Sequence, residues 1–414
     1  MNPALPRQHF VPDSEARVMP DGRLYVYGSY DTCGNNGYCS DVLHVFSTDN
    51  LSAWTDHGVA FSVKDIPWAK EGDLLYAPDC IHNGGKYYLY FCLSDGTEGV
   101  AVSNCPFGPF GNPALIEHAS GDGIDPAIFI DTDTRIYYFW GQFSLRAAEM
   151  NLDMRSLKKE TIIKGLIDEK RFGFHEGASI RKYKDTYILL YTSIERGKAT
   201  CLSHATAKHP LGPYTYRGVV IDNIGCDPDT WNNHGSIECV GDQWYVFYHR
   251  SSQNTNFNRR LCIEPIEIAE DGFIKEVMPT SQGTGEAINA CSLIPASVAC
   301  RLGGWGTNAY IAPDHMLSNE EVIMNASESG WAVYRYVNFD HLIHSVHIEY
   351  QSDAEGEIEV WADDQKVAVT EVFNTNSSYK LATAETLSIR GKRTLYLQWR
   401  LSSGHMKLRN IHFE

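Results

Sequence analysis

Residues 131–143 read DTDTRIYYFWGQF, which is a polar turn followed by a short strand rich in aromatic side chains. The same order of turn and strand recurs four more times, in PDGRLYVYGSYD (20–31), NGGKYYLYFCLSD (83–95), KYKDTYILLYTSIE (182–195) and CVGDQWYVFYHRSS (239–252). Each segment is typical of the second strand of a β-hairpin. The chain therefore contains an internal repeat, and the repeat decides the fold.

The repeats can be aligned on the last large aromatic residue of each strand. These anchors are separated by 63, 50, 51 and 57 residues, and they are Tyr27, Tyr90, Trp140, Tyr191 and Tyr248. This period suits a four-stranded antiparallel sheet with loops of variable length, and no long helical pattern interrupts it. Five such sheets in a chain that must protect its strand edges predict an all-β fold with a five-bladed β-propeller.

Polar residues recur at one position, 11 to 15 residues before each anchor. They are Asp13, Asp79, Asp125, Glu176 and His234. In a propeller this position belongs to the innermost strand of each blade, which lines the central channel. A single acidic residue beside Pro or Gly is an ordinary turn residue. Several carboxylates in one channel repel each other and lose hydration, so the group predicts a functional site or a cation site.

Length and composition exclude several classes of protein. A chain of 414 residues is long enough for two domains. The net charge of -17 argues against nucleic acid and anionic membranes as partners, and no apolar stretch is long enough to span a membrane. Because the first residues lack a signal-like apolar core, we expect a cytoplasmic protein. We expect most of the eleven cysteines to be reduced and buried, and a bridge between Cys33 and Cys39 stays open.

The residue types in the predicted channel favour acid–base chemistry. The sequence contains no GxxxxGK[ST] phosphate loop and no GxSxG nucleophile motif. Glycoside hydrolysis needs one protonated carboxyl group and one ionised carboxylate on opposite sides of the scissile bond, and aromatic side chains commonly hold the sugar. We expect the nearby aromatic residues Tyr76, Phe143 and Trp231 to bind substrate.

The motifs VPDSEA, YAPD, GIDPAIFID, FHEGASI and NNHGSI, in this order and blade phase, resemble glycoside hydrolase family 43 over roughly residues 8–280. The resemblance implies that Asp13 is the general base, that Glu176 is the general acid, and that Asp125 orients the acid and raises its pKa. It also implies inversion of configuration, with the base and acid carboxyl groups about 6.5–9.5 Å apart. One departure is Ser14, which follows Asp13 where the family usually has proline.

The same resemblance implies further contacts around the channel. His234 matches a family histidine on the channel axis, where calcium is expected with water ligands and oxygen donors, and no organic cofactor is expected. Arg260 matches an arginine that hydrogen-bonds the sugar. Arg259 is the competing candidate, because alternation along the strand places only one of the two in the channel. Asp79 matches a family acid that helps to shape the substrate site without transferring a proton.

A second domain follows the propeller. Residues 279–290, PTSQGTGEAINA, are small and polar and predict a linker between a catalytic domain, 1–280, and a second domain, 291–414. Strands of period two in the second domain predict a β-sandwich of the jelly-roll type. This domain resembles carbohydrate-binding modules of family 6, but its loop FNTNSSYK offers only Tyr379 for sugar contact. We expect it to pack against the propeller.

The function expected from these observations is an exo-acting glycosidase with oligosaccharide substrates. It would release terminal α-L-arabinofuranose or β-D-xylose from xylan- or arabinan-derived oligosaccharides. A β-galactosidase acting on galactan fragments is the alternative within the family. A propeller that binds sugar or cations without cleavage is the alternative outside enzymes.

Overall fold

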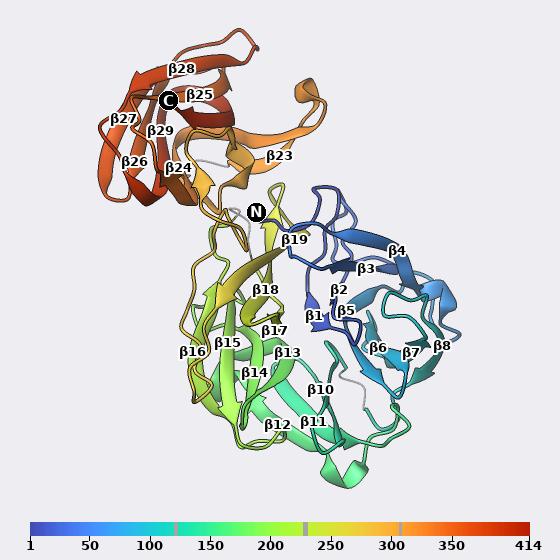
Figure 1. The fold of residues 1–414 in the computed structure, drawn as a ribbon. Coiled ribbons are helices and arrows are strands. Elements are labelled where there is room, and N and C mark those ends of the chain that lie inside the picture. Colours follow the sequence, from blue (N-terminus) through green and yellow to red (C-terminus); the bar gives the residue numbers. More distant parts are fainter. Residues whose placement is uncertain (120–122, 227–230, 306–308) are drawn as a thin grey trace.

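The chain is described by a computed structural model that covers residues 1–119, 123–226, 231–305 and 309–414. Figure 1 shows two bodies, a ring of small antiparallel sheets and a curled sheet formed by the C-terminal third of the chain. The N-terminus lies near their junction, and the C-terminus lies in the second body. Within the described ranges, no helix is both long enough and apolar enough to cross a membrane.

The ring is a five-bladed β-propeller, as the repeat predicts. Each blade is a separate antiparallel sheet whose strands follow one another in chain order. Blade 1 has β1 (Glu15–Val18), β2 (Leu24–Tyr27), β3 (Val42–Thr48) and β4 (Thr55–Ser62). Blade 2 has β5 (Leu75–Asn83), β6 (Lys86–Leu93), β7 (Glu98–Ser103) and β8 (Gly111–Leu115). Blade 3 has β9 (Ala127–Ile130), β10 (Ile136–Trp140), β11 (Ser144–Met150) and β12 (Ile163–Asp168).

The last two blades complete the ring. Blade 4 has β13 (Phe174–Tyr183), β14 (Thr186–Ser193), β15 (Cys201–Ala207) and β16 (Thr215–Asp222). Blade 5 has three strands, β17 (Ser236–Val240), β18 (Gln243–Ser252) and β19 (Thr255–Ile266). The described helical turns are short and connect strands: α1 (Glu169–Phe172), η1 (Val63–Asp65), η2 (Lys159–Thr161), η3 (Ala296–Val298) and η4 (His315–Leu317).

The aromatic anchors explain why the blades pack. Each anchor lies on the second strand of its blade, and each is 0–1% exposed. Among the described residues, the apolar side chains of the propeller form five clusters, each between two neighbouring blades. One of these clusters joins blade 5 to blade 1 through Phe247 and Leu261 against Ala16 and Leu24. Hydrophobic burial therefore continues around the whole ring and closes it.

The N-terminal residues lie along the last strand of blade 5. The Ala4 amide donates to the Leu261 carbonyl at 2.9 Å, and the Ile263 amide donates to Asn2 Oδ1 at 2.9 Å. Asn2 Nδ2 in turn donates to the carboxylate of Glu264 at 2.8 Å. The beginning of the chain thus satisfies the polar backbone of an otherwise open strand edge and adds a second link between blades 5 and 1.

The C-terminal domain is a curled, jelly-roll-like β-sheet with one apolar core. Its long strands are β24 (Glu320–Phe339) and β29 (Gly391–Phe413), which pair with each other along most of their length. The other strands are β20 (Ile288–Asn289), β21 (Ile294–Pro295), β22 (Arg301–Trp305), β23 (Tyr310–Asp314), β25 (Ser345–Ser352), β26 (Gly356–Ala362), β27 (Gln365–Val372) and β28 (Lys380–Glu385). Tyr379, the expected loop aromatic, donates its hydroxyl to Asp314 at 2.8 Å.

The segment between the domains is packed against both of them. The Thr280 amide donates to the buried Glu264 carboxylate at 2.7 Å, and the Ser281 amide donates to the Arg335 carbonyl at 2.6 Å. The small, polar residues after 279 therefore do not form a flexible linker, because hydrogen bonds fix them to both domains.

Further bonds join the two domains directly. The Leu302 amide donates to the Gly225 carbonyl at 2.7 Å, and Arg250 Nη1 donates to the Ala299 carbonyl at 2.8 Å. Leu302, Arg250 and Ala299 are buried, so the propeller and the C-terminal domain pack directly against each other.

The cysteines in the described parts of the chain form no disulfide bonds. Cys33 is exposed and Cys39 is buried, and the two thiols are unbridged in the structure. Cys80, Cys92, Cys201 and Cys262 are buried among apolar side chains, as expected of small core residues.

Candidate active site

Three predicted acids meet at one cavity of the propeller. Asp13 and Asp125 each lie two residues before the innermost strand of their blade, and Glu176 lies within β13 between two register shifts. The cavity measures about 240 Å³ and is lined by Asp13, Tyr38, Cys39, Tyr76, Ile124, Asp125, Gln142, His175, Glu176, Trp231, Asn232, His234 and Arg259. The carboxyl groups come from blades 1, 3 and 4, which the ring brings together.

The backbone at these positions is unusual. Asp13 and Asp125 both have a φ of 54°, in the left-handed region that few residues other than glycine adopt. Gly177, next to Glu176, has a φ of 65°, and a Cβ atom there would lie 2.6 Å from the ring of His234. Left-handed backbone at the same point of three blades turns the side chains into the channel, and such strain concentrates at functional sites.

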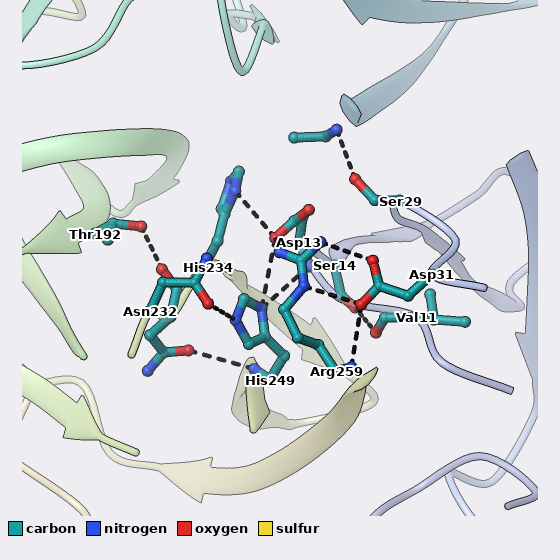
Figure 2. A network of polar contacts seen from close by, with 12 residues as sticks. Val11, Asp13, Ser14, Ser29, Asp31, Thr192, Asn232, His234, His249 and Arg259 are labelled. Atoms are coloured by element: carbon teal, nitrogen blue, oxygen red, sulfur yellow. Dashed lines mark hydrogen bonds and ion pairs between the residues drawn. The ribbon is translucent and has the colours of Figure 1, made fainter. Parts of the chain in front are cut away.

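Arg259 holds Asp13 in place, as Figure 2 shows. Its Nη1 donates to Asp13 Oδ1 at 3.0 Å, while its Nε and Nη2 each donate to the Asp31 carboxylate at 2.9 Å. The backbone amide of Asp13 donates to His249 Nδ1 at 3.3 Å, and His249 Nε2 faces Asn232 Oδ1 at 3.2 Å. All these side chains except that of Asn232 are buried.

The charges around Asp13 favour its ionised form. Burial is the largest single influence and raises the pKa of this carboxyl group, but Arg259, His234, His249 and a hydrogen bond from Ser29 together outweigh it, so the pKa lies below its ordinary value. Burial and the neighbouring Arg259 lower the pKa of His249 to about 3, so the ring is neutral at neutral pH. A neutral ring can accept the Asp13 amide at Nδ1 and donate from Nε2 to Asn232. Asp13 is thus a carboxylate throughout the neutral range.

The pKa of Asp125 is shifted in the opposite direction from that of Asp13. Burial, followed by the negative charges of Glu176 and Asp13, raises the pKa of Asp125 well above its ordinary value. Gln142 Nε2 donates to Glu176 Oε2 at 2.7 Å and fixes the orientation of that carboxyl group. The cavity therefore combines one acid whose ionised form is favoured, Asp13, with a neighbouring acid whose protonated form is favoured, Asp125.

His234 lies between the two aspartates. Its Nδ1 is 3.7 Å from Asp13 Oδ1 and 3.8 Å from Asp125 Oδ2. Calcium prefers six to eight oxygen ligands, whereas this position offers one ring nitrogen and two carboxylates, one of them already bonded to Arg259. The side chains do not form a calcium shell by themselves, and any cation here would need water for most of its ligands.

The structure corrects the choice between the two neighbouring arginines. Arg259 lines the cavity, whereas Arg260 points to the other face of β19 and forms a bidentate ion pair with Glu321 of the C-terminal domain, at 2.6 and 3.0 Å. The guanidinium of Arg260 also lies 4.7 Å from the ring centre of Phe10. The two arginines do lie on opposite faces of β19, as alternation predicts. Arg259, and not Arg260 as expected, is on the face that meets the cavity.

Asp79 is also placed differently from the expectation that it helps to form the substrate site. It pairs across the blade with its own anchor, Tyr90, as Glu15 pairs with Tyr27, so it corresponds to Glu15 and not to Asp13. The residue count agrees, because Asp79 lies 11 residues before its anchor whereas Asp13 lies 14 residues before Tyr27. The Asp79 carboxylate accepts Arg17 at 2.7 and 3.1 Å and lies outside the residues that line the cavity.

The channel next to the cavity is filled by an ion network. Arg17 contacts Glu15 at 3.3 Å, and Arg181 donates to Glu15 at 2.6 Å and to Glu238 at 3.1 Å. Because these side chains come from blades 1, 4 and 5 and are largely buried, the network ties the inner strands together. The carboxylates of this network are neutralised by Arg17 and Arg181 and are separate from the acids of the cavity.

The aromatic candidates lie at the cavity and its rim. Tyr76 and Trp231 line it, and Trp231 is 42% exposed. Phe143 is 50% exposed and lines a neighbouring hollow, with its ring packed edge-on against His175 at 5.0 Å. The Trp231 ring is edge-on to the same histidine, with the ring centres 6.4 Å apart. Phe143, His175 and Trp231 thus form an aromatic rim that the sequence prediction found in part.

Sequence reasoning missed three contributors, Gln142, Tyr38 and His175. Gln142 follows the anchor Trp140 by two residues, and this offset could have identified it. Tyr38 comes from the irregular segment GSYDTCGNNGY, and its ring lies 4.6 Å from the guanidinium of Arg259. Burial, partly opposed by Arg259, raises the pKa of Tyr38 to about 12.

The cavity opens beside two larger hollows. A hollow of about 760 Å³ shares Tyr38 and Cys39 with it, and another of about 460 Å³ shares Tyr76, Ile124 and Gln142. The acids therefore stand in a small chamber, with space on either side for the rest of a larger ligand.

The sequence and structure resemble proteins of known family. The sequence model described as "Glycosyl hydrolases family 43" matches residues 3–274. A "Xylosidase/arabinosidase" of Thermoclostridium stercorarium is 31% identical over 87% of this chain and 87% of its own length. A "Beta-xylosidase" of Xylanibacter ruminicola is 29% identical over 65% of this chain and 97% of its own length.

Solved structures agree with these sequence matches. A β-xylosidase/α-arabinofuranosidase from a compost microbial metagenome, solved with xylotriose in a calcium-free form, is 30% identical with a TM-score of 0.59. It covers 67% of this chain, and this chain covers 97% of it. An arabinoxylan arabinofuranohydrolase from Bacillus subtilis, at 21% identity and a TM-score of 0.56, shares the fold over 100% of this chain and 97% of its own.

Proposed function

The chain belongs to glycosyl hydrolase family 43, and we propose that it removes single terminal pentoses, α-L-arabinofuranose or β-D-xylose, from xylan- or arabinan-derived oligosaccharides, with inversion of configuration. One observation carries this proposal: a chamber of about 240 Å³ is lined by three carboxyl groups, of which Asp13 has a lowered pKa and Asp125 a raised pKa. The enzyme class follows from the family and its xylosidase and arabinosidase relatives.

In this mechanism Asp13 acts as the general base. Its lowered pKa keeps it ionised, and Arg259 and the Asp13 amide contact with His249 fix its position. The carboxylate takes a proton from a water molecule as the water oxygen attacks the anomeric carbon. Attack from the face opposite the leaving group inverts that carbon.

Glu176 acts as the general acid on the other face of the sugar. The bond between the anomeric carbon and the glycosidic oxygen breaks, its electron pair goes to that oxygen, and the oxygen receives the proton of Glu176. Burial and neighbouring carboxylates raise the pKa of Asp125, so Asp125 favours a bound proton beside Glu176. Gln142 holds the Glu176 carboxyl group in position.

The size of the chamber supports release of one sugar at a time. Sites that enclose a drug-sized ligand measure about 300–1,000 Å³, so a chamber of about 240 Å³ suits one pentose and an attacking water. The remainder of the oligosaccharide would occupy a flanking hollow and rest against the rim of Phe143, His175 and Trp231.

Two finer assignments belong to the same proposal. A calcium ion in the channel would lie beside His234 and be held mainly by water, and no step of the reaction is assigned to it. The C-terminal domain would be related to carbohydrate-binding modules of family 6 but would act by packing on the propeller. The ion pair of Arg260 with Glu321 and the engagement of Tyr379 with Asp314 support this role.

The test is a panel of nitrophenyl arabinofuranoside, xyloside and galactoside, together with arabinoxylan and xylan oligosaccharides. We expect turnover of the two pentosides and release of monosaccharide only. Glu176→Ala should reduce kcat/KM on natural oligosaccharides by about 10²–10⁴, and the loss should be smaller for a leaving group that needs no proton. No turnover on any substrate, or full activity of Glu176→Ala on oligosaccharides, would refute the proposal.

A further inference from the structure

A second cluster of ligating side chains lies on the C-terminal domain. His347 on β25 and His412 on β29 are directly opposite each other in the antiparallel register. Glu414 follows β29 directly, two residues after His412, and its carboxylate lies in one cluster with both histidines. The neighbours between these positions, Val346 and Phe413, are buried in the core, which places the cluster on the outer face of the sheet.

The distances within the cluster match those of a metal site. His347 Nε2 lies 3.4 Å from Glu414 Oε2, and His412 Nε2 lies 3.3 Å from Glu414 Oε1. The three ligand atoms lie within 4.8 Å of one another. In a tetrahedral zinc site, with bonds of about 2.0–2.1 Å, neighbouring ligand atoms are about 3.3 Å apart. The ring centres of the two histidines are 4.6 Å apart with an interplanar angle of 16°, so both rings face the carboxylate side by side.

The surrounding structure holds the ligands in position. His347 Nδ1 contacts Thr383 Oγ1 at 2.9 Å, an outer contact that leaves Nε2 able to offer its lone pair. The Glu414 backbone is fixed by hydrogen bonds in both directions with Ser345, at 2.9 and 3.0 Å. Ser345 Oγ also lies 3.0 Å from His347 Nε2, so a bound ion would replace this contact.

We propose that His347, His412 and Glu414 bind one divalent transition-metal ion of the zinc class. Two imidazoles and one carboxylate favour zinc over calcium or magnesium, which prefer oxygen ligands. The side chains of His347, His412 and Glu414 are 13%, 26% and 68% exposed, so an ion can enter from solvent and water completes its coordination. The site is separate from the propeller cavity, and it links β25 to β29 at the end of the domain sheet.

Zinc titration of the chelator-stripped full-length protein tests this inference. The wild type should bind one Zn²⁺ with micromolar or tighter affinity, measured by calorimetry or by competition with a chromophoric chelator, and its Tm should rise with Zn²⁺. His412→Asn and Glu414→Gln should each weaken binding at least tenfold and abolish the rise in Tm. The matched control is His405→Asn, an exposed histidine of the same strand that lies outside the cluster.

Two results would overturn the inference. One is a wild-type protein that binds no Zn²⁺ below millimolar concentration. The other is equal Zn²⁺ affinity in the wild type, His412→Asn and His405→Asn, which would place the ion elsewhere. Pentoside hydrolysis by His412→Asn should match the wild type, so this test stands apart from the proposed activity of the propeller.

Discussion

Replacing Arg259 with methionine should raise the pKa of Asp13 and move the acidic limb of the kcat/KM profile to higher pH. Arg259 Nη1 lies 3.0 Å from Asp13 Oδ1, and both residues are buried. Opposite unit charges about 4 Å apart attract by about 4 kcal/mol at an effective dielectric constant near 20. One pKa unit corresponds to about 1.4 kcal/mol, so the upper bound is about 3 units. Cations next to Asp typically lower its pKa by about 1–3 units.

The assay is kcat/KM for a nitrophenyl pentoside across the pH range. Because a base must be ionised, activity is lost as pH falls through the pKa of Asp13, and that pKa is below its ordinary value in the wild type. We expect the acidic limb of Arg259→Met to lie about 1–3 pH units higher. Arg260→Met is the matched control, because it removes the next arginine of β19 without touching the cavity. An unmoved limb in folded Arg259→Met would refute the assignment of Asp13 as the base poised by Arg259.

Three further predictions concern the neighbouring contacts. Asp125→Asn should lower kcat/KM and move the basic limb to lower pH, because it removes the carboxyl group whose raised pKa favours a bound proton in the cavity; an unchanged pH profile would show that Asp125 is only a turn residue. Gln142→Leu should lower kcat up to about tenfold on oligosaccharides, in line with a neutral hydrogen bond of about 0.5–1.5 kcal/mol, and less on a dinitrophenyl glycoside; equal losses would mean that it does not position the acid. Arg260→Met should lower the free energy of unfolding by about 3–5 kcal/mol, while kcat/KM stays within twofold. The double variant Arg260→Met/Glu321→Gln should recover much of that stability in urea titrations. Additive losses in the double variant would show that the two side chains do not interact.

The sequence predicted the propeller because its repeat is a property of local pattern. Aromatic anchors occur once per blade, and each is buried in an apolar cluster between two neighbouring blades. The curled sheet of the C-terminal domain was harder to foresee in detail. Its period-two pattern gives strands but not their partners, and β24 and β29 pair across most of the domain.

The acids of the site were predictable for the same reason, since Asp13, Asp125 and Glu176 occupy related positions of their blades. Asp79 was misplaced because it lies 11 residues before its anchor, against 14 or 15 at the other four positions, and cross-strand pairing puts it level with Glu15. The choice of Arg260 over Arg259 failed because alternation fixes which residues share a face but not which face meets the channel.

The most direct test of the central claim is the configuration of the first product, followed by proton NMR during hydrolysis of a β-xyloside at high enzyme concentration. A water activated by Asp13 opposite the proton donor Glu176 predicts α-xylose as the first anomer, with β-xylose accumulating only through mutarotation. If β-xylose is formed first, the reaction proceeds with retention, and the assignment of Asp13 as a base that activates water is wrong.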